Sequence, residues 1–145
     1  MKFQLAINLE RMNDGTDMKD VAKHTLEMVQ MADQAGFKIV WAAEHHALEM
    51  TIAPNPFQIL TWWASHTDNI RLGTAVAVAA YWHPINLAGE AAMTDLISGG
   101  RLEFGIGSGA YQRAARAQLL SRSGRRGREG PRHAGSLPGG GIGWA

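Results

Sequence analysis

The feature that most constrains the fold is a repeated unit, in which an apolar strand segment is followed by a segment of helical periodicity. The strand segments begin at residues 3, 38, 70 and 101, so the repeat is 31 to 35 residues long. That is about the length of a βαβ unit, and nearly continuous apolar strands are typical of a parallel sheet buried on both faces. The sequence therefore predicts an α/β fold.

The ends of these elements carry local signals. The first helix is expected to begin at Thr16 or Asp17, either of which can cap its N-terminus, and to stop at Gly36. Asn55 can cap the second helix, and Pro56 suits its first turn because its φ is already helical. The expected strands are residues 3–9, 38–43, 70–79 and 101–106, and the later helices begin near residues 56 and 84 and end near residues 67 and 98.

Two architectures accommodate four such units. An open doubly wound sheet can be completed within the 145 residues of this chain, whereas a (β/α)₈ barrel needs about 250 residues. Length alone therefore favours the open sheet. A dinucleotide-binding domain, however, places its glycine-rich turn after the first strand, and here that turn follows the fourth strand, at residues 105–109. The dinucleotide-binding alternative thereby loses its main support.

Composition narrows the class of protein further. The chain has no cysteine, which excludes a disulfide framework, a thiolate nucleophile and a Cys-type zinc site. No apolar run is long enough for a signal peptide or a membrane span, so the expected location is the cytoplasm. We expect no metal site, because the helical zinc motif is missing and His24, His66 and His83 fall on three different elements.

Residues 1–113 and 114–145 are two different kinds of sequence. The first segment has a net charge of −4, whereas the second contains six arginines against Glu129 alone and eight of the 17 glycines. Because the second segment shows no sustained periodicity, we expect it to be disordered. An alternative is that the chain is a small α/β binding module whose basic tail contacts nucleic acid through phosphates, although no aromatic residue is interleaved with the arginines. Another is that the tail is GC-rich DNA translated out of frame.

Candidate chemistry follows the second strand, where Glu44, His45 and His46 stand in a row. The C-terminal ends of parallel strands are where α/β folds keep their chemistry, and a histidine there can exchange a proton near neutral pH. Adjacent residues of an extended chain point in opposite directions, so we expect one histidine to face the site and the other the loop. The alternative is a pair of solvated loop histidines.

Two other segments could contribute to a site. The glycines of residues 105–109 would let the backbone approach a phosphate or a flat ring, or would serve a turn that needs positive φ. The small residues within 72–76 leave room for a flat group, or mark a bulge. Four aromatic residues could line a substrate pocket, although a place in the core is the more common role: Trp62, Trp63, Tyr81 and Trp82.

Taken in order, these motifs resemble the bacterial-luciferase-like flavin-dependent monooxygenases. The resemblance extends to about Arg113, and the segment after it has no counterpart. Each motif is ordinary by itself, but their common register over this length is specific. The matching positions are residues 36–37, 41, 44–46, 55–56, 71–76, 83–84, 90, 95–96, 98–101 and 104–109.

The resemblance implies an α/β fold in which this chain supplies the N-terminal half, four βα units, of a (β/α)₈ TIM-type barrel. It implies a site at the C-terminal rim for reduced FMN, or a deazaflavin in some branches, which captures O₂ and passes one oxygen atom to a small organic substrate. By analogy, His45 is the catalytic histidine. Ala75 and Val76 form a bulge, often with a non-proline cis bond, that braces the flavin ring. Gly107 and Ser108 also contact the cofactor.

The sequence differs from the family pattern in two respects that affect the expected function. Ser108 stands where the luciferases proper carry an arginine, which argues against long-chain aldehyde bioluminescence. The late strands, whose loops bind the phosphate and shape the substrate pocket, have no counterpart, so we expect the isolated chain to be inactive and the substrate stays open. Two sheet edges and an inner face that we expect to be apolar would lie uncovered. The implied partners are a flavin reductase and, in the full-length form, a second copy.

Overall fold

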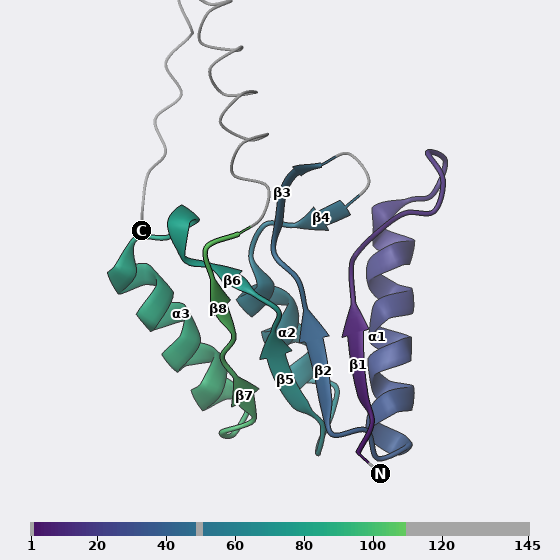
Figure 1. Cartoon of the computed structure of the whole chain (residues 1–145). Helices are drawn as coiled ribbons and strands as arrows, with labels where there is room; N and C mark the ends of the chain where they lie inside the picture. The colour runs from purple at the N-terminus through teal and green to yellow at the C-terminus, as the bar shows by residue number, and fades with distance from the viewer. Residues whose placement is uncertain (1, 49–50, 110–145) are drawn as a thin grey trace, which may run out of the picture. The chain divides into compact units, whose positions relative to one another are not determined.

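The computed structural model describes residues 2–48 and 51–109 (Figure 1). The predicted disorder of residues 114–145 therefore lies outside the described residues. Within the described part, no helix is both long and apolar enough to cross a bilayer. In chain order the elements are β1 (Gln4–Ile7), α1 (Met18–Gln34), β2 (Ile39–Ala42), β3 (His45–Leu48), β4 (Thr51–Ala53), α2 (Pro56–Ala64), β5 (Arg71–Thr74), β6 (Ala77–Val78), the 3₁₀ turn η1 (Ala79–Tyr81), α3 (Pro84–Ile97), β7 (Leu102–Glu103) and β8 (Ile106–Gly107).

The main sheet has four parallel strands whose order is the order of the chain, β1-β2-β5-β7. Val40 in β2 pairs with Leu5 on one side and Leu72 on the other. A doubly wound sheet reverses its strand order at a switch point and carries helices on both faces. Here the strands follow the order of the chain, and the successive helices lie on one side of the sheet (Figure 1). This arrangement is that of part of the wall of a (β/α)₈ barrel. The open-sheet alternative is therefore wrong.

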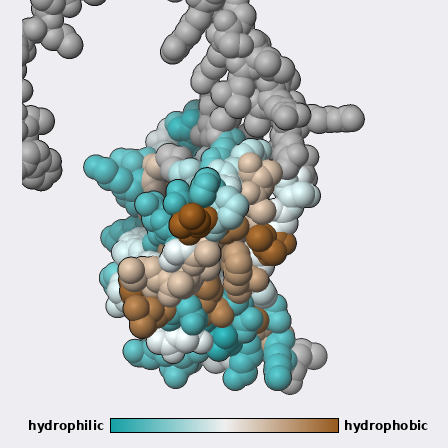
Figure 2. Space-filling view, turned by 90° about the vertical axis from the view of Figure 1, so that its left-hand side faces the viewer, coloured by the Kyte–Doolittle hydropathy of each residue, from teal (hydrophilic) through white to brown (hydrophobic). Residues whose placement is uncertain are grey.

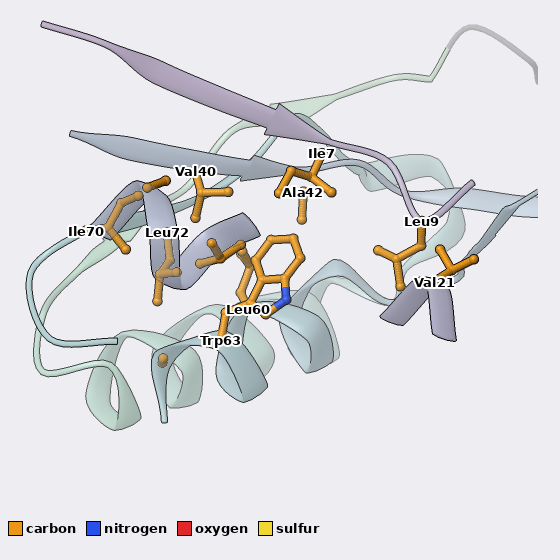
Figure 3. Close-up of a cluster of buried hydrophobic side chains, with 12 residues drawn as sticks. Ile7, Leu9, Val21, Val40, Ala42, Leu60, Trp63, Ile70 and Leu72 are labelled. Carbon is orange, nitrogen blue, oxygen red and sulfur yellow. The ribbon is translucent and has the colours of Figure 1, made fainter. Parts of the chain in front are cut away.

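The core lies between this sheet and the first two helices (Figure 3). Alternate residues of β2 and β5 point toward the helices, and the Trp63 side chain of α2 fills the space beneath them with no exposed surface. Burial of such a side chain removes a large apolar area from water. The labelled members of this cluster are Ile7, Leu9, Val21, Val40, Ala42, Leu60, Trp63, Ile70 and Leu72.

The helix ends confirm the signals in the sequence. The Asp17 carboxylate accepts a hydrogen bond from the N–H of Lys19 at 2.9 Å and caps α1. The Asn55 side chain accepts from the N–H of Phe57 at 2.9 Å and caps α2, with a proline in the first turn. Gly36, just beyond α1, has a φ of +76°, a conformation that favours glycine.

Strands three and four differ from the prediction because each is interrupted. The third strand divides into β5 and β6 at Ala75 and Val76, and the fourth divides into β7 and β8 at Phe104 and Gly105. β6 and β8 then pair with each other in parallel as a separate two-stranded sheet. The hairpin of β3 and β4, which the sequence did not indicate, extends from the end of β2. All three differences lie toward the C-terminal ends of the strands.

The inner face of the sheet, opposite the helices, is not the apolar surface that we expected. The indole N–H of Trp41 donates to the Gln4 side chain at 2.9 Å. Arg71 forms an ion pair with Glu103 across β5 and β7. These side chains occupy the strand positions that alternate with the core residues, so polar groups and an aromatic ring cover much of this face.

Replacement of Gly73 by alanine is expected to destabilise the fold. A Cβ at this position would overlap the six-membered ring of Trp41, which the hydrogen bond to Gln4 holds across the strand. Overpacking of this kind costs about 1–3 kcal/mol. Gly89→Ala on α3 is the matched control, because no atom lies within 4 Å of its added Cβ and alanine favours a helix. Urea unfolding followed by circular dichroism measures both variants, and equal stability of the two would contradict this packing.

Candidate functional site

The predicted site residues lie along one rim of the sheet, which we define as the C-terminal ends of β2, β6 and β8 and the residues that follow β2 (Figure 1). The N–H of Ala75 donates to the carbonyl of Ala42 at 2.8 Å, which joins the end of β2 to the break in the third strand. Val78 pairs with Gly107 and joins the third strand to the fourth. The three strand ends are therefore contiguous, as a shared site requires.

Glu44 is the buried charge of the rim. Its side chain has no exposed surface, yet its two oxygens lie within hydrogen-bond distance of three nitrogen atoms from different parts of the rim. The N–H of Val78 donates to Oε2 at 2.7 Å, and the indole N–H of Trp82 donates to Oε1 and Oε2 at 3.1 and 3.0 Å. His46 Nε2 lies 2.6 Å from Oε1. A buried carboxylate needs such partners, because desolvation without them is costly.

The two histidines have different surroundings. His46 contacts Glu44 and packs edge-on against the ring of Tyr81, with 4.7 Å between ring centroids, and a third of its side chain is exposed. His45 is partly buried and has no hydrogen-bond partner among the described residues. The alternation of side chains along an extended chain explains the difference, because Glu44 and His46 are two residues apart and His45 lies between them.

The break in the third strand contains a cis peptide bond between Ala75 and Val76, the bond that the family resemblance implied. Both residues are exposed at the rim, whereas Thr74 before them and Ala77 after them are fully buried. The small Ala75 and the Val76 side chain thus present an apolar surface at the break in the third strand. Such a surface fits a flat aromatic ring, because it adds no bulk above the strand and no polar group that the ring would leave unpaired.

Gly105 and Gly107 of the fourth strand lie in close contact with the third strand, where a side chain at either position would meet neighbouring atoms. Gly105 lies so close to Thr74 that an added Cβ would overlap the Thr74 carbonyl, and the Thr74 hydroxyl accepts from the Gly105 N–H at 2.9 Å and donates to its carbonyl at 2.7 Å. A Cβ on Gly107 would lie 2.8 Å from Cγ2 of Val76. These two glycines therefore set the position of the break that carries the cis bond.

The aromatic residues divide between the core and the rim. Trp63 belongs to the core cluster and the partly buried Trp62 packs against it, which confirms the more common role for this pair. Trp82 packs against Phe57 with 5.6 Å between ring centroids, and both it and Tyr81 contact the Glu44 and His46 pair. The sequence placed Glu44 in the row with the two histidines and Trp82 among the possible pocket aromatics, but it did not predict the contact between them. The spacing of Glu44 and His46 could have indicated their pairing, but the contact with Trp82 spans 38 residues of chain and depends on the fold.

A wall of four parallel strands in chain order defines the fold of the chain as part of a (β/α)₈ barrel. The family model for luciferase-like monooxygenases matches residues 1–129, and the chain belongs to that family. The match reaches beyond Arg113, the residue near which the resemblance of the motifs ends. Among described residues, no group of three potential ligand side chains could hold a metal ion.

Individual relatives agree with the family. The oxygenase component of the flavin-dependent trigonelline monooxygenase of Acinetobacter baylyi is 50% identical over 111 residues, which cover 77% of this chain and 31% of that protein. The 4-hydroxyprotoasukamycin monooxygenase of Streptomyces nodosus subsp. asukaensis is 35% identical over 85 residues, 59% of this chain and 23% of that protein. The chain spans a quarter to a third of the length of these curated relatives.

Solved structures show the same fold. Monooxygenase RslO1 from Streptomyces bottropensis superposes with a TM-score of 0.73 and 30% identity, over 88% of this chain and 39% of that one. The oxygenating constituent of 3,6-diketocamphane monooxygenase from Pseudomonas putida, solved in complex with FMN, gives a TM-score of 0.73 and 26% identity, over 81% of this chain and 32% of that one. The strand order of this chain is therefore that of a partial TIM barrel.

Alanine at Gly105 is expected to destabilise the chain more than alanine at Gly107. The backbone carbonyl of Thr74 has no room to retreat from a new Cβ, whereas the Val76 side chain can shift by a few tenths of an ångström. We expect a loss near the upper end of the range of about 1–3 kcal/mol for Gly105→Ala and near the lower end for Gly107→Ala. Thermal unfolding measures both, with Gly15→Ala as a near-neutral control because its nearest neighbour would lie at 3.8 Å. The reverse order would show that the two strands are not in this close contact.

Proposed function

We propose that the chain forms the N-terminal wall of the active site of a monooxygenase, in which reduced FMN and O₂ oxygenate a small organic substrate. The observation that carries the proposal is the rim itself, where the exposed apolar residues Ala75 and Val76 are joined to the end of β2, which the two histidines follow, by the hydrogen bond from the Ala75 N–H to the Ala42 carbonyl. The family match and the FMN complex of a similar structure support it. No observation on the described residues favours the alternative of a nucleic-acid-binding module.

Each residue at the rim has a role in this proposal. Ala75 and Val76 brace one face of the flavin ring, and Gly107 and Ser108 lie on the next strand end, where they contact the cofactor. When bound, reduced flavin supplies the electrons that activate O₂. The His45 imidazole, which no described side chain holds by a hydrogen bond, is the group that moves a proton at the reacting oxygen. Deazaflavin is the alternative cofactor.

A second copy is the proposed partner in the full-length protein. Large apolar side chains lie exposed on α3, separated by small residues, on the side of the molecule that Figure 2 shows. An exposed stripe of this kind on a helix indicates a contact with another helix, since its apolar surface would otherwise remain in water. The other proposed partner is a flavin reductase, in keeping with a relative described as an oxygenase component. The exposed side chains are Ile85, Met93, Leu96 and Ile97.

We expect the 145-residue chain by itself to bind FMN weakly and to catalyse no oxygenation. Barrels of this type bind the cofactor phosphate through loops of the late strands, and the chain covers only about a third of its relatives' length. Titration of FMN and of a deazaflavin, followed by quenching of flavin fluorescence, measures the affinity. Flavin that copurifies at about one equivalent per chain would contradict the expectation.

A completed barrel tests the proposed function directly. Residues 1–109 can replace the matching segment of the trigonelline monooxygenase oxygenase component, which is 50% identical in this region. With reduced FMN supplied, the chimera is expected to oxygenate trigonelline, and His45→Ala to lower kcat by about 100- to 10,000-fold, the usual contribution of a proton-transferring side chain. His66→Ala is the control, because His66 is exposed at the opposite end of the strands.

Two results would contradict the assignment. One is a folded, FMN-bound chimera that does not oxygenate its substrate. The other is a His45→Ala variant with the parent's kcat, which would remove His45 from the reaction while leaving the flavin site in place.

A further inference from the structure

The Glu44 carboxylate has three hydrogen-bond partners, which come from three different parts of the rim. Val78 donates a backbone N–H, and Trp82 donates an indole N–H to both oxygens. Neither group can accept a hydrogen bond at its nitrogen, so the Glu44 carboxylate accepts from both. The third partner is His46, whose Nε2 lies 2.6 Å from an oxygen that already accepts from Trp82.

The contact with Glu44 involves only the Nε2 atom of His46. An ionised carboxylate can only accept, so His46 donates from Nε2 and its neutral form has the proton there. Nδ1 is then the nitrogen with a free lone pair, and no described residue forms a hydrogen bond with it. The ring is held from a second direction by its edge-on contact with Tyr81. The imidazole is thus oriented before any ligand arrives.

We propose that Glu44 is a positioning residue of the site, which fixes His46 as the Nε2–H tautomer and anchors the strand after the cis bond through Val78. The positioning of His46 by Glu44 does not depend on the proposed function. Only the use of that positioning rests on it, namely that a proton-accepting Nδ1 and the Val76 surface are presented at the same rim. A carboxylate that orients an imidazole through one nitrogen controls the chemistry of the other nitrogen. His45 keeps its proposed role, because it is not part of this hydrogen-bond network.

Glutamine at position 44 gives the sharpest test, because an amide has one oxygen and one NH₂ group. An NH₂ group at the Oε2 position would face two donors, Val78 at 2.7 Å and Trp82 at 3.0 Å. At the Oε1 position it would face Trp82 at 3.1 Å and His46 at 2.6 Å, and His46 can become an acceptor. The amide is therefore expected to take the second orientation and to donate to Nε2, which moves the His46 proton to Nδ1.

The experiment uses the full chain labelled with ¹⁵N at histidine, in alkaline solution where the imidazoles are neutral. Two-bond ¹H–¹⁵N correlation spectra distinguish the two tautomers, and loss of the signals in His46→Gln assigns them. We expect the parent and Trp82→Phe to show His46 as Nε2–H, and Glu44→Gln to show it as Nδ1–H. His45 is the internal reference, and its signals are expected to keep their positions. A purely structural role for Glu44 would not reverse the tautomer.

A second variant keeps the test decisive if Glu44→Gln does not fold. In Glu44→Gln with Trp82→Phe, the donor that opposes the amide NH₂ is removed while a ring still packs against Phe57. This double variant is expected to fold and to show Nδ1–H. The proposal is overturned if His46 keeps the parent tautomer in a folded variant, as judged by slow amide exchange at Val40 and Leu72 in the core. Because no flavin is present, failure of this test and failure of the flavin assignment are separate results.

Discussion

The close contact between the third and fourth strands is the constraint on which the rest of the rim depends. Gly105 approaches Thr74 so closely that no side chain fits between them, and the Thr74 hydroxyl bonds to both the N–H and the carbonyl of Gly105. Both strands leave the main sheet at this level and resume as β6 and β8. The interruption turns Ala75 and Val76 outward at the rim, and Glu44 holds the chain that follows through Val78.

In this arrangement the glycine-rich turn allows two strands to pack closely, which is a different role from phosphate binding. Gly105 and Gly107 face the neighbouring strand, where Thr74 and Val76 occupy the space that their side chains would need. The turn therefore shapes the surface on which a flat cofactor is proposed to lie, rather than surrounding a charged group. The same pattern of glycines in a dinucleotide-binding domain serves a different purpose because it follows a different strand.

The sequence predicted the local parts of this structure and missed the parts that depend on contacts between strands. Helix caps at Asp17 and Asn55 and the glycine after α1 follow from residues a few positions apart, so they were predicted correctly. The family resemblance implied the break in strand three at Ala75 and Val76. The break in strand four follows from close packing across the sheet, which apolar periodicity cannot reveal. The inner face was predicted to be apolar because the strands were taken as continuous runs, and the polar side chains of Arg71 and Glu103 at alternate positions correct that view.

The central claim is that this rim was shaped to hold a flat redox ring beside an imidazole. A crystal structure of the completed barrel with FMN tests it most directly. We predict that the flavin ring lies in van der Waals contact with Val76, on the side of the rim where His45 and His46 lie. A flavin bound elsewhere, with Val76 and both imidazoles out of its reach, would contradict it.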